Sequence, residues 1–407
     1  MKIKLLFCAM LGLLLSGSAF SQWTALSSGT SSDLSSVSFA NEQTGWIAGK
    51  SGLLRHTTDG GATWTSQVSG TSKDIYSVHF ISTTTGWIAG KDGIIRTTTN
   101  GGATWTLQSS GASAKINSIH FINATNGIAV GEDGIILTTS DGGTNWIIRA
   151  GNAGGSGSSS DEGSDLHDVQ MINPQVAYAC GKDGIFVKTI NGGVNWVTQN
   201  STVTEDLEAL HFPSETRGYV CYELGKVKQT NGTGTFTSVY SATSKDLKDL
   251  WFINEHRGWV IGDEGRILLT DNSGASWSSH NVNTTEELTA IHFPSAFTGY
   301  IVGKKGLLYK LTNADKAGLA DLNDVSSAVS IFPNPAQNEL TISFSENIFN
   351  GENVTIKLID QQGKTILFTE SQSIQHISLD LNPIEKGLYT LQLVSNQKIA
   401  IQKIIKL

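Results

Sequence analysis

A phrase of twenty residues recurs along the first three quarters of the chain and constrains its fold more than any other feature. It reads GWIAGKDGIIRTTTNGGATW at residues 86–105, and close copies occupy residues 45–64 and 127–146. Each copy predicts a strand, a tight turn, a second strand and a second turn that ends at a tryptophan. A chain built from such copies is expected to fold as a repeat architecture.

The period of the repeat indicates the architecture. A unit of about 40 residues with four short strands is typical of a β-propeller blade. Inner strands with a Val/Ile/Leu-x-Phe/Met core are predicted at residues 37–39, 78–80, 119–121, 169–171, 210–212, 250–252 and 291–293. The closing aromatic residues are Trp64, Trp105, Trp146, Trp196, Phe236 and Trp277.

The fold class predicted is all-β, with a seven-bladed propeller at residues 22–313. The seventh copy ends near Asn313 without a closing tryptophan, whereas Trp23 stands alone before the first copy. We therefore expect residues 23–26 to supply the last strand and to close the ring, which would pair the strand edges that an open ring leaves exposed.

The second turn of each copy follows the pattern Thr-x-Asp/Asn-x-Gly-x-Thr/Asn/Ser-Trp. The side chain of its Asp or Asn can accept hydrogen bonds from backbone N–H groups inside the turn. Because Asn replaces Asp freely, we interpret these residues as turn formers and not as catalytic acids. They are Asp59, Asn100, Asp141, Asn191 and Asn272.

These turns resemble the Asp-box, or bacterial neuraminidase repeat, of β-propeller proteins. The whole unit, with its Gly-Trp-Ile strand and its Gly-Gly turn, resembles the photosystem II assembly/stability-factor-like propeller family over residues 23–313. This resemblance concerns the fold module and implies no photosynthetic role.

Both ends of the chain predict export. Residues 1–21 read as a signal peptide, with Lys2 and Lys4 before an apolar run and a small-x-small cleavage site. Residues 314–328 read as a linker, and residues 329–407 alternate as a small C-terminal β-sandwich. No other stretch is apolar enough for a transmembrane helix.

The C-terminal unit resembles a type IX secretion system type A sorting domain. The residues that carry this resemblance are Pro333, Asn334, Pro335, Gly387, Tyr389 and Lys403. The resemblance implies the type IX secretion machinery as a partner and delivery through the periplasm to the outer cell surface or medium. It also implies that the sorting domain is then removed.

Charge and composition exclude some partners and cofactors. The net charge of −8 argues against nucleic acid and anionic membranes. The Gly/Ser-rich insertion at residues 151–165 has no calcium-binding spacing. We expect no metal and no cofactor, and a monomer.

A ring of acidic residues is the main candidate binding site. The residue before each inner strand is acidic in six repeats of seven, and the exception is Lys115. Equivalent positions of a closed ring lie at one mouth of its channel, where like charges focus a negative potential that favours a cationic ligand or basic peptide. The alternative is a turn role at the strand start. The ring consists of Asp33, Asp74, Asp165, Asp206, Asp246 and Glu287.

Other candidate sites are weaker. His79, His120, His211 and His292 share one inner-strand position, which fits a metal-binding or pH-sensitive ring less well than packing between blades. Cys180 and Cys221 occupy equivalent positions of neighbouring repeats, as a disulfide or as two small buried residues.

The function predicted is an exported, non-enzymatic binding or scaffold protein whose ligand is a protein or a glycan. We predict no catalytic residue, because the few arginines do not form the triad that a sialidase needs. The alternatives are a secreted glycan-active hydrolase of the sialidase-like type and an envelope assembly or chaperone-like factor.

Overall fold

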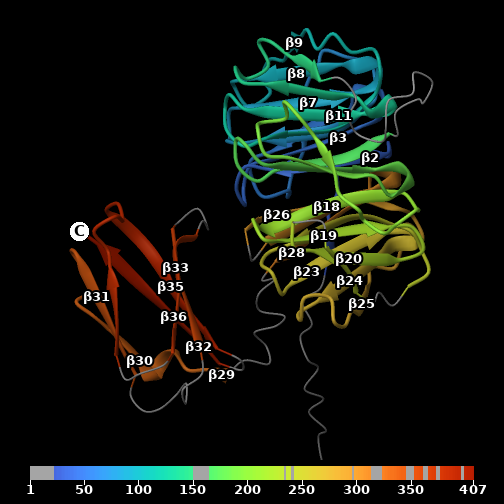
Figure 1. The fold of residues 1–407 in the computed structure, drawn as a ribbon. Coiled ribbons are helices and arrows are strands. Elements are labelled where there is room, and N and C mark those ends of the chain that lie inside the picture. Colours follow the sequence, from blue (N-terminus) through green and yellow to red (C-terminus); the bar gives the residue numbers. More distant parts are fainter. Residues whose placement is uncertain are drawn as a thin grey trace, which may run out of the picture.

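The chain forms an all-β structure in a computed structural model (Figure 1). The structure describes residues 23–149, 165–232, 235–239, 243–295, 298–312, 323–344, 353–360, 365–372, 376–395 and 398–407. The signal peptide predicted at 1–21, the insertion up to residue 164 and the first part of the linker lie outside these residues. Over the described ranges the only helical segments are short 3-10 turns, which confirms the all-β class.

Seven four-stranded antiparallel sheets make up the part of the chain described up to Thr312. Their inner strands are β2 (Leu34–Phe39), β6 (Ile75–Phe80), β10 (Ile116–Phe121), β14 (Leu166–Met171), β18 (Leu207–Ser214), β22 (Leu247–Phe252) and β26 (Leu288–Ser295). The second strands are β3 (Gly45–Gly49), β7 (Gly86–Gly90), β11 (Gly127–Gly131), β15 (Ala177–Gly181), β19 (Arg217–Tyr222), β23 (Gly258–Gly262) and β27 (Thr298–Gly303).

The outer half of each sheet contains a third and a fourth strand. The third strands are β4 (Leu54–Thr57), β8 (Ile95–Thr98), β12 (Ile136–Thr139), β16 (Phe186–Thr189), β20 (Lys226–Thr230), β24 (Arg266–Thr270) and β28 (Leu308–Thr312). The fourth strands are β5 (Thr65–Ser66), β9 (Thr106–Gln108), β13 (Ile147–Arg149), β17 (Val197–Thr198), β21 (Phe236–Val239), β25 (Ser278–Asn281) and β1 (Thr24–Ala25).

The N-terminal strand β1 is the fourth strand of the last sheet. Thr24 lies opposite Lys310, and Ala25 lies opposite Tyr309 of β28. Trp23 meets Phe293 edge-on at 6.0 Å between ring centroids, much as Trp64 meets Phe39 at 5.9 Å in the first sheet. Each inner strand packs against the inner strand of the next sheet, and β26 packs against β2.

Flat aromatic stacks join neighbouring sheets. In the first pair, Trp46 of a second strand lies on Phe80 of the next inner strand, with 3.3 Å between ring centroids and 2° between planes. Tyr300 of the last sheet lies on Phe39 of the first in the same way, at 3.7 Å. The other stacks are Trp87 on Phe121, Tyr178 on Phe212, Tyr219 on Phe252 and the more tilted Trp259 on Phe293.

The presence of glycine at the start of the second strand has a steric explanation. A Cβ on Gly86 would lie 2.5 Å from the ring of Phe80 in its own sheet, closer than real Cβ contacts occur. The fourth sheet is the exception, because Met171 replaces the phenylalanine and Ala177 replaces the glycine. The large ring and the glycine therefore change together.

The turns after the third strands are closed by the side chains that the sequence pattern predicts. Thr57 donates from Oγ1 to Asp59 Oδ1 at 2.7 Å and accepts the N–H of Gly61 at 2.9 Å. Asp59 Oδ1 also accepts the N–H of Thr63 at 2.9 Å. An amide oxygen can do the same, and Asn100 does so, which explains the exchange of Asp and Asn. The same bonds form around Asp141, Asn191 and Asn272.

The C-terminal unit is a β-sandwich of two sheets. The larger sheet has the order β29-β36-β35-β32-β33, and the smaller has the order β30-β31-β34. Strand β29 pairs with β36, so the sandwich begins at Asn323, inside the segment predicted as a linker. The strands are β29 (Asn323–Asp324), β30 (Val329–Phe332), β31 (Glu339–Phe344), β32 (Asn353–Ile359), β33 (Thr365–Gln372), β34 (His376–Asp380), β35 (Gly387–Ser395) and β36 (Lys398–Lys406).

The two cysteines within the described residues are free and fully buried. Cys180 packs in the core between the fourth and fifth sheets, and Cys221 packs in the next core along the chain. They therefore act as small core residues. Burial raises the pKa of both thiols well above its usual value, which keeps them protonated.

We predict that Gly86→Ala lowers the free energy of unfolding by about 1–3 kcal/mol, because the added methyl group overlaps the ring of Phe80. In the double variant Phe80→Met/Gly86→Ala, which copies the fourth sheet, the two losses should not add. Urea denaturation of both single variants and the double variant measures this coupling. Strictly additive losses would show that ring and glycine are independent.

Candidate functional site

A polar cavity opens where the inner strands begin, and we call it the vestibule. Its volume is about 410 Å³ and six inner strands contribute to it. Of the predicted acidic ring, Asp33, Asp74 and Asp165 line it, and Asp206, Asp246 and Glu287 do not. Its lining consists of Asp33, Leu34, Ser35, Lys50, Asp74, Ile75, Tyr76, Lys115, Asn117, Asp165, His167, Glu208, Thr289 and Lys304.

Five ring aspartates each fasten their own sheet to the one before it. Asp74 Oδ1 accepts the N–H of Ser51 at 2.7 Å, and Ser51 has a positive φ of 56° in the turn between the second and third strands of the preceding sheet. This cap gives the ring a structural role that the sequence left open. The equivalent bonds join Asp33 to Lys305, Asp165 to Asp133, Asp206 to Asp183 and Asp246 to Leu224.

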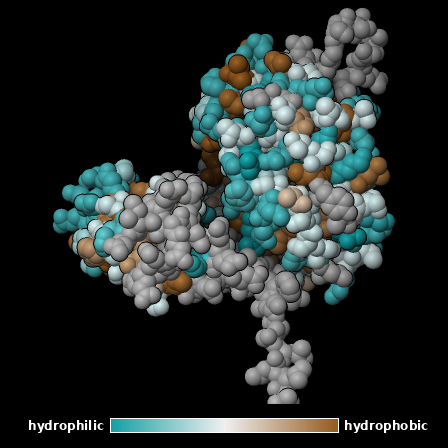
Figure 2. Space-filling model, turned by 60° about the horizontal axis from the view of Figure 1, so that its bottom comes forward, coloured by the Kyte–Doolittle hydropathy of each residue, from teal (hydrophilic) through white to brown (hydrophobic). Residues whose placement is uncertain are grey.

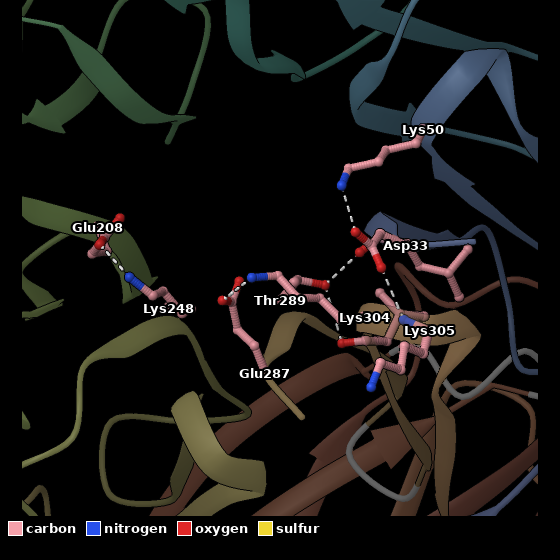
Figure 3. A network of polar contacts seen from close by, with 10 residues as sticks. Asp33, Lys50, Glu208, Lys248, Glu287, Thr289, Lys304 and Lys305 are labelled. Atoms are coloured by element: carbon pink, nitrogen blue, oxygen red, sulfur yellow. Dashed lines mark hydrogen bonds and ion pairs between the residues drawn. The ribbon is translucent and has the colours of Figure 1, made fainter. Parts of the chain in front are cut away.

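Lysines offset part of the negative charge around the vestibule. Figure 3 shows three ion pairs there, and the first joins Asp33 to Lys50 at 2.5 Å. The pKa of Asp33 is lowered by the N–H of Lys305 and then by the ammonium of Lys50. The other two pairs join Glu287 to Lys304 at 2.5 Å and Glu208 to Lys248 at 2.8 Å. The mouth is therefore mixed in charge, and not uniformly acidic as the ring alone suggested.

Second residues of inner strands lie at the floor of the vestibule, and four of them share one role: Ser35, Asn117, His167 and Thr289. These residues bind a backbone carbonyl of the following sheet. Thr289 donates from Oγ1 to Leu34 O at 2.8 Å, and Asn117 donates from Nδ2 to Leu166 O at 2.8 Å. Ser35 and His167 donate in the same way to Ile75 O and Leu207 O. Sequence reasoning missed them because the residue type differs in every repeat; only their shared register could have found them.

Deeper in the molecule, the third residue of four inner strands accepts an N–H group of the next sheet. Ser36 Oγ accepts the N–H of Val78 at 3.1 Å. In the sixth sheet Asp249 takes this place and accepts the N–H groups of Leu250 at 2.7 Å and of Ile291 at 2.8 Å. Burial, with the nearby charge of Asp168, raises the pKa of Asp249 to about 8. Its role is to bind backbone.

Three of the four inner-strand histidines, His79, His120 and His211, bond to the backbone of the next sheet. Nδ1 of His120 accepts the N–H of Met171, and Nδ1 of His211 accepts the N–H of Phe252, both at 3.3 Å. Burial lowers the pKa of His79 to about 4 and that of His211 and His292 to about 3, so all three are neutral near pH 7. These contacts support packing between sheets as their role.

Two arginines of the third strands bind main chain. Arg55 Nη1 donates to Ser28 O at 2.6 Å, and Arg96 Nη1 donates to Trp105 O at 3.2 Å. Among the residues that the structure describes, no group of three His, Cys, Asp or Glu is placed to hold a metal ion. The same residues contain no helix with the length and hydrophobicity of a membrane span.

The sorting-domain residues meet at the C-terminal strand. Asn334, between Pro333 and Pro335, accepts the N–H of Ile405 at 2.9 Å and donates to Lys403 O at 2.7 Å, so its amide continues the edge of β36. In the adjacent strand β35, which Gly387 opens, Tyr389 donates from its hydroxyl to Glu385 O at 2.8 Å. The motif therefore fixes the last two strands.

Two family models match the chain. The model of photosynthesis system II assembly factor YCF48 matches residues 16–110, 65–158 and 228–318. The model of the secretion system C-terminal sorting domain matches residues 330–407. No curated protein sequence matches significantly.

Solved structures share the propeller fold. One entitled "YCF48 bound to D1 peptide" is 23% identical at a TM-score of 0.61, over 72% of this chain and 97% of that chain. YCF48 from Cyanidioschyzon merolae is 20% identical at 0.62, over 72% and 99%. The WD40 β-propeller domain of Doa1 is 13% identical at 0.59, over 74% and 99%. At these identities the likeness establishes the fold alone.

We predict that Asp249→Ser, which introduces the residue found in the first three repeats, gains stability relative to the wild type as the pH rises. The folded wild type holds a proton on Asp249 up to about pH 8. The unfolded chain releases this proton above its usual carboxyl pKa of about 4, so unfolding becomes easier as the pH rises between these values. Urea denaturation at about pH 5 and about pH 8 measures the difference. A pH-independent difference would contradict the role of this carboxyl.

Proposed function

The chain belongs to the photosynthesis system II assembly factor YCF48 family, whose model matches more than half of it, and from this premise we propose that it is an exported, non-enzymatic scaffold that docks a partner polypeptide. The vestibule carries the proposal. It is a concave polar site held by inter-sheet bonds, and rigid concave sites of this kind suit ligand binding.

The proposed scaffold is a ring of seven blades closed by β1. Three contacts support closure. Strand β1 pairs with β28, β26 packs against β2, and Tyr300 stacks on Phe39. A closed ring leaves no open sheet edge at a seam, so loops at its mouth can keep a fixed arrangement.

A polypeptide partner is favoured by the relatives. One solved YCF48 structure is entitled as bound to a peptide, and we extend peptide docking to this chain. On the face seen in Figure 2, hydrophobic side chains are scattered among hydrophilic ones. A polar, charged site fits that surface better than an apolar docking patch does.

A non-enzymatic role is supported by what the charged groups bind. Asp249 and Asp168 accept backbone N–H groups, and Arg55 and Arg96 donate to backbone carbonyls. A sialidase-like site needs arginines and acids that converge on the substrate. These groups instead form their hydrogen bonds with the backbone of the protein itself.

Export places this binding outside the cell. The C-terminal sorting domain marks proteins that the type IX secretion system exports to the cell surface or medium. We propose that residues 323–407 deliver the propeller by this route and are then removed, as the sorting-domain resemblance implies.

We predict that the fourfold variant Asp33→Asn, Asp74→Asn, Asp206→Asn and Asp246→Asn captures the partner about tenfold less well from an envelope extract. The loss of ring charge weakens attraction, and Asn still accepts the turn N–H. Quantitative pull-down at low and physiological salt measures it. Assays for sialidase and other glycosidases on the wild type should give only background.

The matched control is Asp59→Asn/Asp141→Asn, because these turns lie at the opposite ends of the strands and Asn100 shows that an amide is accepted there. This control should bind like the wild type. Unchanged capture by the fourfold variant, or hydrolysis of a glycan by the wild type, would refute the proposal.

We predict that a chain ending before Asn323 accumulates in the periplasm of a type IX-secreting host instead of the medium or surface. The deletion removes the sandwich and leaves the seven sheets intact. Cell fractionation with immunoblotting measures the location. Export of the truncated chain at the full-length level would contradict delivery through this domain.

A further inference from the structure

We infer that the vestibule floor is a hydrogen-bond acceptor surface that takes a single cationic N–H group, the guanidinium or ammonium of an Arg or Lys side chain of the partner polypeptide. The inference rests on the proposed function and names the chemistry of its site. It follows from the direction of the floor hydrogen bonds, which the sequence does not reveal.

The floor residues use their donors to hold the fold. Thr289 Oγ1 and Asn117 Nδ2 each donate to a carbonyl of the following sheet at 2.8 Å. Ser35 donates to Ile75 O, and His167 donates from Nδ1 to Leu207 O at 3.0 Å. These carbonyls are backbone groups at the start of the inner strands, so the donors are committed in the folded ring.

What remains for a ligand is mostly acceptor capacity. A hydroxyl that has donated its hydrogen keeps its lone pairs, and a neutral imidazole that donates from Nδ1 keeps Nε2 as an acceptor. Asn117 keeps Oδ1 beside its second amide hydrogen. Glu208, whose side chain is 22% exposed, adds a carboxylate to the same lining. A donor-rich group therefore finds more partners here than an acceptor-rich one.

The charges around the cavity favour a cation. Its lining has four carboxylates and three lysines. Each of these lysines is paired with a carboxylate: Lys50 with Asp33, Lys115 with Glu132 and Lys304 with Glu287.

Two lining carboxylates remain for a ligand. Asp74 and Asp165 form no ion pair with a lysine or arginine in the described parts of the chain. Each uses Oδ1 to accept a turn N–H, and the Asp74 carboxylate also has the hydroxyl of Tyr76 beside it as a hydrogen-bond partner. Their second oxygens supply the charge that a guanidinium or ammonium can pair with.

The test compares two double variants of the full chain. Asp74→Asn/Asp165→Asn removes the two unpaired lining carboxylates, and the retained amide oxygen still caps Ser51 and Asp133. The control Asp206→Asn/Asp246→Asn makes the same charge change at ring positions outside the cavity, with the same type of cap. Thermal melts establish that all three proteins are folded.

The probe is a dye-labelled acetyl-Ala-Arg-Ala-amide, titrated by fluorescence anisotropy at about pH 8. Its citrulline counterpart has nearly the same shape without the charge. We expect the wild type to bind the arginine peptide at least about tenfold more tightly than the citrulline peptide. The Asp74/Asp165 variant should lose about tenfold, and the Asp206/Asp246 control should stay within about twofold.

Two further ligands distinguish a cationic side chain of a polypeptide from a free polyamine. A lysine peptide should bind, and spermidine should bind more weakly than either peptide. If both double variants lose the same affinity for the arginine peptide, the general field of the acidic ring explains binding and the inference is wrong. If the citrulline peptide binds as tightly as the arginine peptide, the inference is also wrong. Tighter binding of spermidine would assign the site to free polyamines and overturn the polypeptide source. If the envelope partner is captured and the arginine peptide is not bound, this inference fails and the proposed function stands.

Discussion

Six of the seven sheets share one steric fit on which their arrangement depends, a phenylalanine ring held between two surfaces. The fourth sheet has Met171 and Ala177 instead. On one side lies the glycine that opens the second strand of the same sheet, where a Cβ would approach the ring to about 2.4 Å. On the other side lies the aromatic residue of the preceding sheet, as with Tyr300 on Phe39. Close-packed interiors tolerate little change in volume, so each seam fixes the spacing and tilt of its neighbours. The same fit joins the last sheet to the first, where Tyr300 lies on Phe39.

Polar bonds at three levels of the inner strands then set the register between sheets. The second residue donates to a carbonyl of the next sheet, whereas the third and fifth residues accept its N–H groups, as Thr289, Ser36 and His120 show. Because backbone groups of neighbouring inner strands are too far apart to form a ladder, side chains supply the bonds that the backbone needs. This explains why Ser, Gln and His can alternate at the fifth position, as Ser38, Gln170 and His211 show. Each of these side chains bonds to the equivalent backbone N–H of the next sheet, so this bond does not decide which of them is present.

Sequence reasoning predicted the period, the all-β class, the Asp-box turns and the sorting domain, because each depends on local residue types at fixed spacing. It predicted the acidic ring as a set of equivalent positions, but not what those residues bind. Asp74 caps Ser51, which precedes it by 23 residues and belongs to another sheet, and Asp33 pairs with Lys50 across a turn. The first partner depends on the angle between two sheets, and the second on the register of β2 with β3 within one sheet; a repeat pattern encodes neither. The pairing of β29 with β36, near the far end of the chain, is hidden from sequence reasoning for a similar reason.

A binding site of this kind requires few groups beyond those that already stabilise the fold. The groups that face the vestibule already hold neighbouring sheets together, so their orientation is set before any ligand arrives, and a preorganised site avoids much of the entropy lost on binding. The two oxygens of Asp165 have different roles. Oδ1 accepts the N–H of Asp133, and the other oxygen remains for the cavity that Asp165 lines. Because the cap needs only an acceptor, Asn would satisfy the fold equally well, and the choice of Asp adds only charge. Asp206 and Asp246 form the same cap outside the cavity, whereas at Asp74 and Asp165 the charge of the carboxylate also reaches the vestibule.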